Sequence, residues 1–275
     1  MEKPVQIIIE PEKGTANFFH ELYEYRELLV FLSLRDILVR YKQTVFGVAW
    51  AVMRPVLTMA IFTFIFGNLA HMPSHGIPYP VLVFAAMLPW QFFANTVAES
   101  SNSLIANENM VSKVYFPKII IPTSSMMVSL LDFFISFAIL ITMMLYYKMW
   151  FNSRFLFFPL YLLLLVFLSL GIGYWISALN VKYRDFRYIV PFALQVGLYV
   201  TPVGFSSAVV PDKWKFLYAL NPMVGIVDGF RWVLLGNSIE LYTGGIYLSV
   251  SCTFLILLTG IWFFNKNESS FADII

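Results

Sequence analysis

The sequence predicts an all-α integral membrane protein with six transmembrane helices, an N-terminal amphipathic interfacial helix and a re-entrant helical pair before the last span. Three observations predict this fold class. Hydrophobic residues make up 59% of the 275 residues and charged residues only 12%, about half the usual fraction for a soluble domain. The mean hydropathy is +0.74. Apolar stretches long enough to cross a bilayer recur along the chain, separated by Pro, Gly, Asn or charge, so we expect one membrane domain.

Charge and cysteine content narrow the functional classes. The formal net charge of +2 is too small to indicate a nucleic-acid partner. The single cysteine, Cys252, excludes a disulfide within the chain. Residues 1–19 lack an apolar region followed by a small-residue cleavage site, so they are not expected to form a signal peptide.

The first predicted element is an amphipathic helix over residues 17–42, which begins at Asn17. Its acidic and apolar stripes lie on different faces, with Glu21, Glu24 and Glu27 on one and Phe18, Leu22, Leu29 and Leu32 on the other. A helix of this kind beside a transmembrane span is expected to lie in the membrane interface. It is either a plain anchor or a cuff along the cytoplasmic surface that partners contact.

Six stretches are long and apolar enough to span a bilayer as helices: residues 44–70, 79–104, 117–147, 155–179, 188–209 and 242–264. If the N-terminus is cytoplasmic, 13 lysine and arginine residues lie inside and 5 lie outside. Cytoplasmic loops carry the excess of these cations, so both termini are predicted to be cytoplasmic.

Residues 180–188, "NVKYRDFRY", are predicted to form a short cytoplasmic loop between the fourth and fifth spans. Their three cations fix the topology and can contact anionic lipid headgroups. That role alone is sufficient to explain the charge, although a functional role remains open.

Residues 212–237 are apolar enough to suggest a seventh span, but Asn221-Pro222 breaks them and Asp228 and Arg231 interrupt their second half. The residue before a proline avoids helical geometry. Each half therefore makes at most about 20 Å of helix, too short to cross. We expect two short re-entrant helices, in which Asp228 and Arg231 could pair at i, i+3. The alternative is a broken seventh span, which would place the C-terminus outside.

Several kinds of chemistry have no sequence signal. The chain contains no Gly-Lys pair and therefore no P-loop. No Cys or His pair has zinc-ligand spacing, and Pro73 separates His71 from His75. No catalytic or metal-binding residue is predicted. Asp132, in the third span, is either a functional carboxylate or a protonated or paired one that only fixes helix packing.

Four stretches resemble one family in its own order. They are "RDILVRYKQTVFGVAWAVMRPVLTM" (35–59), "NENMVSKVYFPKIIIPTSS" (107–125), "ALNVKYRDFRYIVPFALQVGLYVTPVGFSS" (178–207) and "LNPMVGIVDGFRWVLLG" (220–236). The chain is similar to the type-2 ABC exporter permeases that move polysaccharides such as O antigen, capsule and teichoic acid.

The resemblance implies a homodimer in the bacterial cytoplasmic (inner) membrane with two separate ATP-binding subunits and a lipid-linked glycan as cargo. ATP and Mg would be bound by the partner subunits, and this chain would bind no cofactor of its own. It would form the channel and would not be an enzyme.

The resemblance also implies that the short segment 107–118 is the helix that couples to the ATPase. Within it we expect Glu108 and Lys113 to make the contacts, with the apolar Val111, Val114 and Tyr115 seating the helix. The pyrophosphate of the cargo would meet cations at the cytoplasmic face, namely Arg40, Lys42, Arg184 and Arg187. Because sugars stack on aromatic rings, we expect Tyr199, Phe230 and Trp232 to line the pore and outer gate, with Asp228 and Arg231 as the charges of the gate.

Other functions stay open at this stage. One is a type-2 ABC permease for a drug or small lipid. Another is a membrane-embedded glycan- or lipid-modifying enzyme, which should show clustered His, Asp or Glu at the membrane surface. A third is an ion-coupled secondary transporter, which should show several buried ionisable residues or a duplicated half. An ATPase with a P-loop encoded in the adjacent reading frame would favour the exporter.

Overall fold

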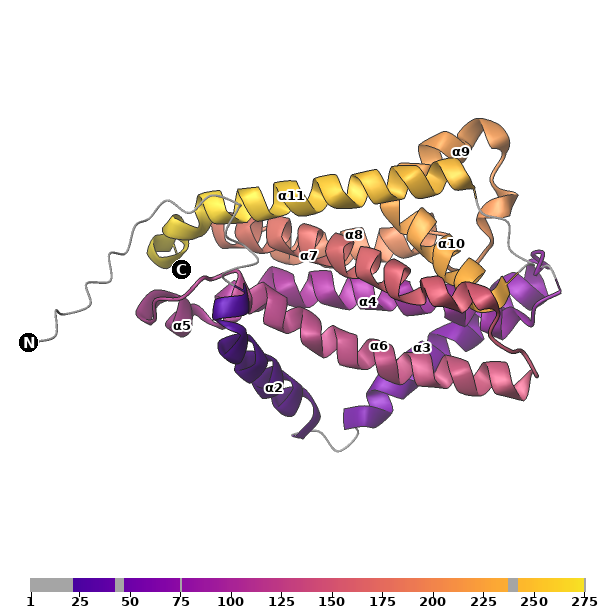
Figure 1. Ribbon diagram of the computed structural model, residues 1–275, viewed down its shortest axis with the longest axis horizontal. Coiled ribbons are helices and arrows are strands. Elements are labelled where there is room, and N and C mark those ends of the chain that lie inside the picture. The colour runs from indigo at the N-terminus through magenta and orange to yellow at the C-terminus, as the bar shows by residue number, and fades with distance from the viewer. Residues whose placement is uncertain (1–21, 43–46, 75, 237–241, 275) are drawn as a thin grey trace, which may run out of the picture.

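The computed structural model describes residues 22–42, 47–74, 76–236 and 242–274, and every regular element in these ranges is helical (Figure 1). The elements are α2 (Arg26–Lys42), α3 (Gly47–Phe62), η2 (Thr63–Leu69), α4 (Tyr79–Ala106), α5 (Glu108–Lys113), α6 (Ile120–Tyr146), η3 (Ser153–Phe157), α7 (Phe158–Lys182), α8 (Phe186–Val200), η4 (Ser207–Val209), α9 (Asp212–Ala219), α10 (Pro222–Leu235) and α11 (Thr243–Ile274). The predicted cap Asn17 and the first residues of the predicted first span, 44–46, lie outside the described ranges.

Five described helical stretches are long and apolar enough to cross a membrane: Val52–Leu69, Tyr79–Ala106, Ile120–Tyr146, Ser153–Lys182 and Thr243–Phe271. The remaining predicted span, residues 188–209, corresponds to α8. Its 15 residues give a helix of about 22 Å, shorter than the hydrocarbon core of about 30 Å. The prediction of a sixth span therefore stays a prediction for this element.

Helix α8 ends at Val200 because a proline follows. Thr201 has extended backbone angles, φ −84° and ψ 145°, as expected for a residue before proline. Residues 201–205 then form irregular turns instead of continuing the helix to 209. Irregular backbone at this depth needs protein partners for its polar groups.

Helix α4 is the centre of the bundle and packs against α3, α6, α7, α8 and α10. Within an 18-residue apolar stretch of α4, 78% of the residues are buried. Helices α7 and α11 also pack closely. A Cβ added to Gly260 would lie only 2.4 Å from the carbonyl oxygen of Gly171, so the two backbones approach too closely for a larger residue there. Small residues that allow backbones to approach are typical of helix packing in membranes.

Two helices are packed much more lightly against the rest of the chain. Only 11% of the residues in Val52–Leu69 are buried, and Val190 is the one buried residue of α8. Both helices present large apolar side chains outward, including Leu57, Ile61 and Phe192. These faces are available to lipid or to another protein chain.

The two ends of the bundle carry different elements (Figure 1). Helix α5 and the end of α11 lie at one end, called here the α5 end, whereas α9 and α10 lie toward the other, called the α9 end. The sequence-predicted break at Asn221-Pro222 separates α9 from α10, and the Asn221 side chain accepts a hydrogen bond from the backbone N–H of Met223 at 3.0 Å. The re-entrant course of this pair in a membrane stays a prediction.

Candidate functional site

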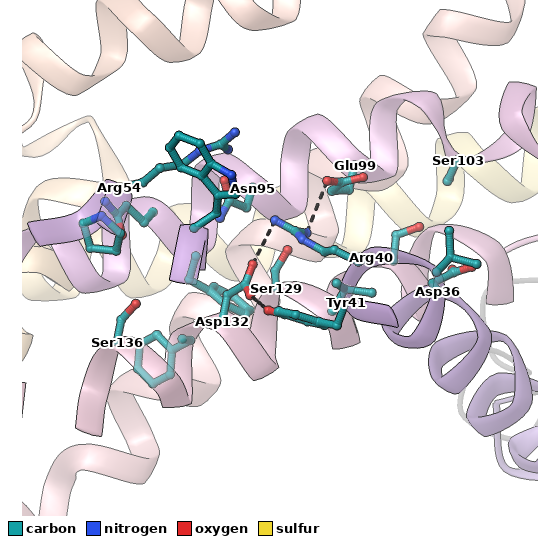
Figure 2. A pocket seen from close by; sticks show the side chains of 18 of the residues that line it. Asp36, Arg40, Tyr41, Arg54, Asn95, Glu99, Ser103, Ser129, Asp132 and Ser136 are labelled. Atoms are coloured by element: carbon teal, nitrogen blue, oxygen red, sulfur yellow. Dashed lines mark hydrogen bonds and ion pairs between the residues drawn. The ribbon is translucent and has the colours of Figure 1, made fainter. Parts of the chain in front are cut away.

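Helices α2, α3, α4 and α6 enclose a cleft of about 870 Å³, called here the polar cleft. Figure 2 shows it from close by. Its volume lies within the range of small-molecule sites. Charged and amide side chains are unusually frequent in its lining for a chain this apolar, and they include Arg40, Arg54, Gln91, Asn95, Glu99 and Asp132.

Arg40 is the hub of an ion-pair cluster in this cleft. Its Nη2 atom lies 3.0 Å from Oδ2 of Asp132 on α6, and its Nη1 atom lies 3.4 Å from Oε1 of Glu99 on α4. The side chain of Asp132 is only 12% exposed, whereas that of Glu99 is 53% exposed. The intramembrane carboxylate thus has a cationic partner, which agrees with the expectation of a paired Asp132.

Tyr41 completes the coordination of Asp132. Its hydroxyl group donates a hydrogen bond to Oδ1 of the carboxylate. Burial raises the pKa of the Tyr41 phenol, and the hydrogen bond to Asp132 raises it further. The phenol therefore stays protonated at neutral pH and acts as a donor. Two consecutive residues at the end of α2 hold one carboxylate of α6, which attaches the interfacial helix to the bundle.

A second contact attaches α2 near the α5 end. The Arg35 side chain binds Asp36 on its own helix, with Nη2 2.7 Å from Oδ1. The same Nη2 atom donates to Oδ1 of Asn107 at 2.9 Å. Asn107 is the residue between α4 and α5, so a movement of α2 would be transmitted directly to the start of α5.

The predicted coupling segment is a short helix that packs on this chain through one side. Val111 is 2% exposed, and α5 contacts α11 and α4. Glu108 and Lys113 are exposed, and Val114 and Tyr115 after them are exposed as well. Val111 therefore seats α5 on its own bundle, and four of the five predicted contact residues remain accessible to a partner.

Lys118 ties the end of this segment to the last helix. Its backbone N–H donates to Oε1 of Glu268 at 2.6 Å, and its Nζ donates to the Glu268 carbonyl at 3.2 Å. Together with the contact between Arg35 and Asn107, this fixes residues 107–118 at both ends. The segment is positioned by α2 on one side and α11 on the other.

The structure does not gather the four cations predicted to meet a headgroup. Arg40 faces Asp132 and Glu99 in the polar cleft, and Lys42 is exposed at the end of α2. Arg184 and Arg187 are exposed around the turn from α7 to α8. Helix α2 packs on α6 and α3, whereas α8 packs on α4 and α7, so the two groups lie on different parts of the bundle.

Arg231 is 1% exposed, and its guanidinium makes no direct ion pair with Asp228 within 4.0 Å, although the two opposite charges attract each other. Its guanidinium instead donates to three backbone carbonyls, those of Leu82 at 3.2 Å, Val203 at 3.0 Å and Phe205 at 2.8 Å. Two of these carbonyls belong to the irregular turns after α8. Arg231 is drawn to them because they lack partners within a helix.

Other contacts hold the same turns. The Tyr79 hydroxyl donates to the Gly204 carbonyl at 2.7 Å, and Nδ2 of Asn221 donates to the Thr201 hydroxyl at 3.2 Å. We call this group the Arg231 cluster; it consists of Tyr79, Thr201, Gly204, Asn221 and Arg231, with the carbonyls that they contact. It joins α4, α8 and the α9–α10 pair.

The predicted pore aromatics differ in their surroundings. Tyr199 is 62% exposed on α8. Phe230 is fully buried against Phe133 and Phe158, so within this chain its ring faces the core and no open surface. The ring of Trp232 stacks under the guanidinium of Arg154 at 4.7 Å.

Sequence reasoning missed the polar cleft, although a signal was present. On α4, Gln91, Asn95 and Glu99 recur at intervals of four, which places them on one helical face. On α6, Ser129, Asp132 and Ser136 recur at intervals of three and four. Polar stripes on two neighbouring membrane helices predict a shared polar face. Arg54 was counted only among the 13 lysine and arginine residues that indicate the membrane orientation.

Comparison with known proteins gives a consistent result. The family described as ABC-2 type transporter matches residues 27–235. A Klebsiella pneumoniae protein named O-antigen export system permease protein RfbA is 29% identical over 251 residues, which cover 90% of this chain and 95% of that protein. A Myxococcus xanthus protein of the same name is 28% identical over 214 residues, which cover 77% of this chain and 81% of that protein.

Proposed function

Because the chain belongs to the ABC-2 type transporter family, we propose that it is the transmembrane permease subunit of an ATP-driven exporter for a lipid-linked, O-antigen-like polysaccharide. One observation carries the proposal. The similarity to an O-antigen export permease extends over 90% of this chain and 95% of the relative, and the family match over residues 27–235 includes the coupling segment and the α9–α10 pair.

The working transporter in this proposal is a homodimer with two ATP-binding subunits in the bacterial inner membrane. Both termini are cytoplasmic, and ATP and Mg are bound by the partner subunits. The absence of a Gly-Lys pair and the membrane-spanning helices support a division of labour in which this chain forms the channel. The lightly packed outer faces of α3 and α8 support a second copy beside them.

Helix α5 is the proposed contact with the ATP-binding subunit. Its exposed residues Glu108 and Lys113, followed by Val114 and Tyr115, offer charge and apolar surface side by side. The anchored ends of segment 107–118 support a role in transmission, since a push on α5 reaches α2 through Arg35 and α11 through Glu268. In the same proposal, Tyr199 lines the glycan path and the α9–α10 pair closes it.

Crosslinking and transport together test the proposal. The natural Cys252 is first replaced by serine, and a single cysteine is placed at Tyr115, which is 70% exposed. The control carries its cysteine at Tyr146, which is 81% exposed at the far end of α6. After co-expression with the ATP-binding subunit, the first variant is expected to crosslink to it and the second is not.

Transport is measured in vesicles that hold both subunits and a lipid-linked glycan. ATP-dependent appearance of the glycan on the opposite face is the expected result. Movement of a small fluorescent lipid or drug without the glycan would support the small-substrate permease instead. Chemical modification of the glycan without its movement would support a membrane-embedded enzyme.

A further inference from the structure

The polar cleft contains hydrogen-bond donors that the chain itself does not use. Arg54 lies on α3 and lines the cleft, and Figure 2 shows it facing the same space as Arg40, with Asn95 and Glu99 of α4 and Asp132 of α6 around them. Among the described residues, no carboxylate lies within 4.0 Å of the Arg54 guanidinium. A guanidinium without a counter-ion in a membrane span is costly unless a ligand or water neutralises it.

The acids around the cleft are already committed to other cations. Asp132 and Glu99 bind Arg40, and Asp36 binds Arg35. Asp132 and Glu99 share the single guanidinium of Arg40, so their negative charges are only partly compensated. Arg54 is left as the charge that a ligand can meet.

Amide and hydroxyl groups near Arg54 are also unused. Gln91 and Asn95 line the cleft one helical turn apart, and neither side chain makes a hydrogen bond within the described part of the chain. Ser129 lines the cleft as well; it is completely buried, and its hydroxyl oxygen has no partner. An unpaired buried hydroxyl costs about 1–3 kcal/mol. Donors from α3, α4 and α6 thus converge on one unfilled space.

Trp50 adds an aromatic surface to the same place. It lies one turn before Arg54, lines the cleft and is 47% exposed. The Arg54 guanidinium lies 5.9 Å from the centre of its ring. A guanidinium binds phosphate in a bidentate manner, whereas a tryptophan ring presents an apolar face on which a sugar ring can stack. Side-chain amides suit the hydroxyl groups of a sugar.

We infer that the polar cleft binds the glycosyl-phosphate end of a prenyl-linked lipid, with Arg54 on the phosphate, Trp50 on the first sugar and Gln91 and Asn95 on its hydroxyl groups. The assignment of the ligand as a cargo lipid and not a membrane phospholipid rests on the proposed function. The assignment of a phosphate-binding site at Arg54 does not depend on that function. This places the headgroup in the cleft beside α3, away from Arg184 and Arg187 on the turn before α8.

The test measures equilibrium binding to the full chain in lipid nanodiscs. The two probes are farnesyl diphosphate and the same molecule with one glucose on its terminal phosphate. Arg54→Gln is expected to weaken both probes at least tenfold, because it removes the charge and the bidentate geometry. Arg187→Gln, which changes an exposed cation outside the cleft, should leave both affinities within twofold of wild type.

Trp50→Leu separates the sugar contact from the phosphate contact. It should remove most of the affinity gained by adding glucose and leave farnesyl diphosphate within about twofold. Each variant is used only if its elution profile and thermal midpoint match those of wild type. If Arg54→Gln misfolds, Asn95→Leu takes its place and should weaken the glucose-bearing probe selectively.

Other outcomes have defined meanings. Equal binding by wild type and Arg54→Gln, or an equal loss in Arg187→Gln, overturns the site. If phosphatidylglycerol competes for the site as well as the glucose-bearing probe does, the phosphate site stands and its assignment to cargo is overturned. If Arg54-dependent binding persists while the two-subunit vesicles export no glycan, the proposed function fails and the binding site survives.

Discussion

The Arg231 cluster and the polar cleft both place an arginine inside a membrane domain, yet they use it differently. Arg231 is 1% exposed and its guanidinium donates to three backbone carbonyls. Arg54 is exposed to the cleft and makes no ion pair within the described ranges. One arginine is satisfied by the fold, and the other is not.

The physical reason lies in the backbone around each. Residues 201–205 are irregular, so their carbonyls have no helical partner and accept from Arg231. The cleft is walled by regular helices, whose carbonyls are largely satisfied within each helix. Donors there find only side chains, and the two acids on α4 and α6 are held by Arg40. The comparison shows that the donors of Arg231 are satisfied within the chain and stabilise the fold, whereas the polar cleft contains donors that remain available to a ligand.

The largest effect is expected from Arg231→Ala. It leaves three buried carbonyls without their donor, and each buried polar group left unsatisfied costs about 1–3 kcal/mol. Unfolding in detergent by denaturant titration measures this loss. Arg154→Ala, which removes a cation–π contact at the same end of the bundle, should cost only about 0.5–1 kcal/mol. A similar small loss for Arg231→Ala would contradict the structural role of the cluster.

A smaller effect is expected from Asp132→Asn. It keeps the size of the side chain but removes the charge that Arg40 and Tyr41 hold. A hydrogen bond to a charged group contributes about 1.5–3 kcal/mol when buried, and partial exposure of Arg40 lowers this to about 1–2 kcal/mol. The loss of unfolding free energy should be accompanied by faster proteolysis of α2. Glu99→Gln is the matched control, and its exposed contact should contribute under about 1 kcal/mol.

The smallest effect on stability is expected from Arg54→Gln. No ion pair is lost, so the free energy of unfolding should stay within about 0.5 kcal/mol of wild type. The same variant should lose phosphate-lipid binding, and Arg231→Lys, if it folds, should retain that binding. The two arginines would then separate stability from binding. A strong destabilisation by Arg54→Gln would show that the cleft uses Arg54 structurally and would remove the contrast.

Local physics explains why much of the fold was predictable. Apolar length predicted five of the six spans, and Asn221-Pro222 lies where α9 and α10 separate. The span predicted for 188–209 instead ends early, before Thr201-Pro202. Each of these features depends on a few neighbouring residues. The pairing of Asp228 with Arg231 was also argued locally, from the spacing on one helix, but the direct partners of the Arg231 guanidinium are carbonyls more distant in sequence.

The candidate site divides along the same line. The spacing of Gln91, Asn95, Ser129 and Asp132 predicts the polar stripes of α4 and α6. The spacing does not predict that these stripes line one cleft, because that depends on how α2 and α3 pack onto the two helices. Phe230 shows the same limit, since nothing in its spacing says that rings from α6 and α7 pack against it.

The sequence by itself determined that this chain is a helical membrane protein, where most of its helices begin and end, and which faces of α4 and α6 are polar. Only the tertiary structure decided which charges meet. Tyr41 and Asp132 are 91 positions apart, and Arg231 and Leu82 are 149 apart. Hydrophobic length and proline geometry act over a few residues, whereas a hydrogen bond requires contact in space, and packing of the whole bundle sets that contact.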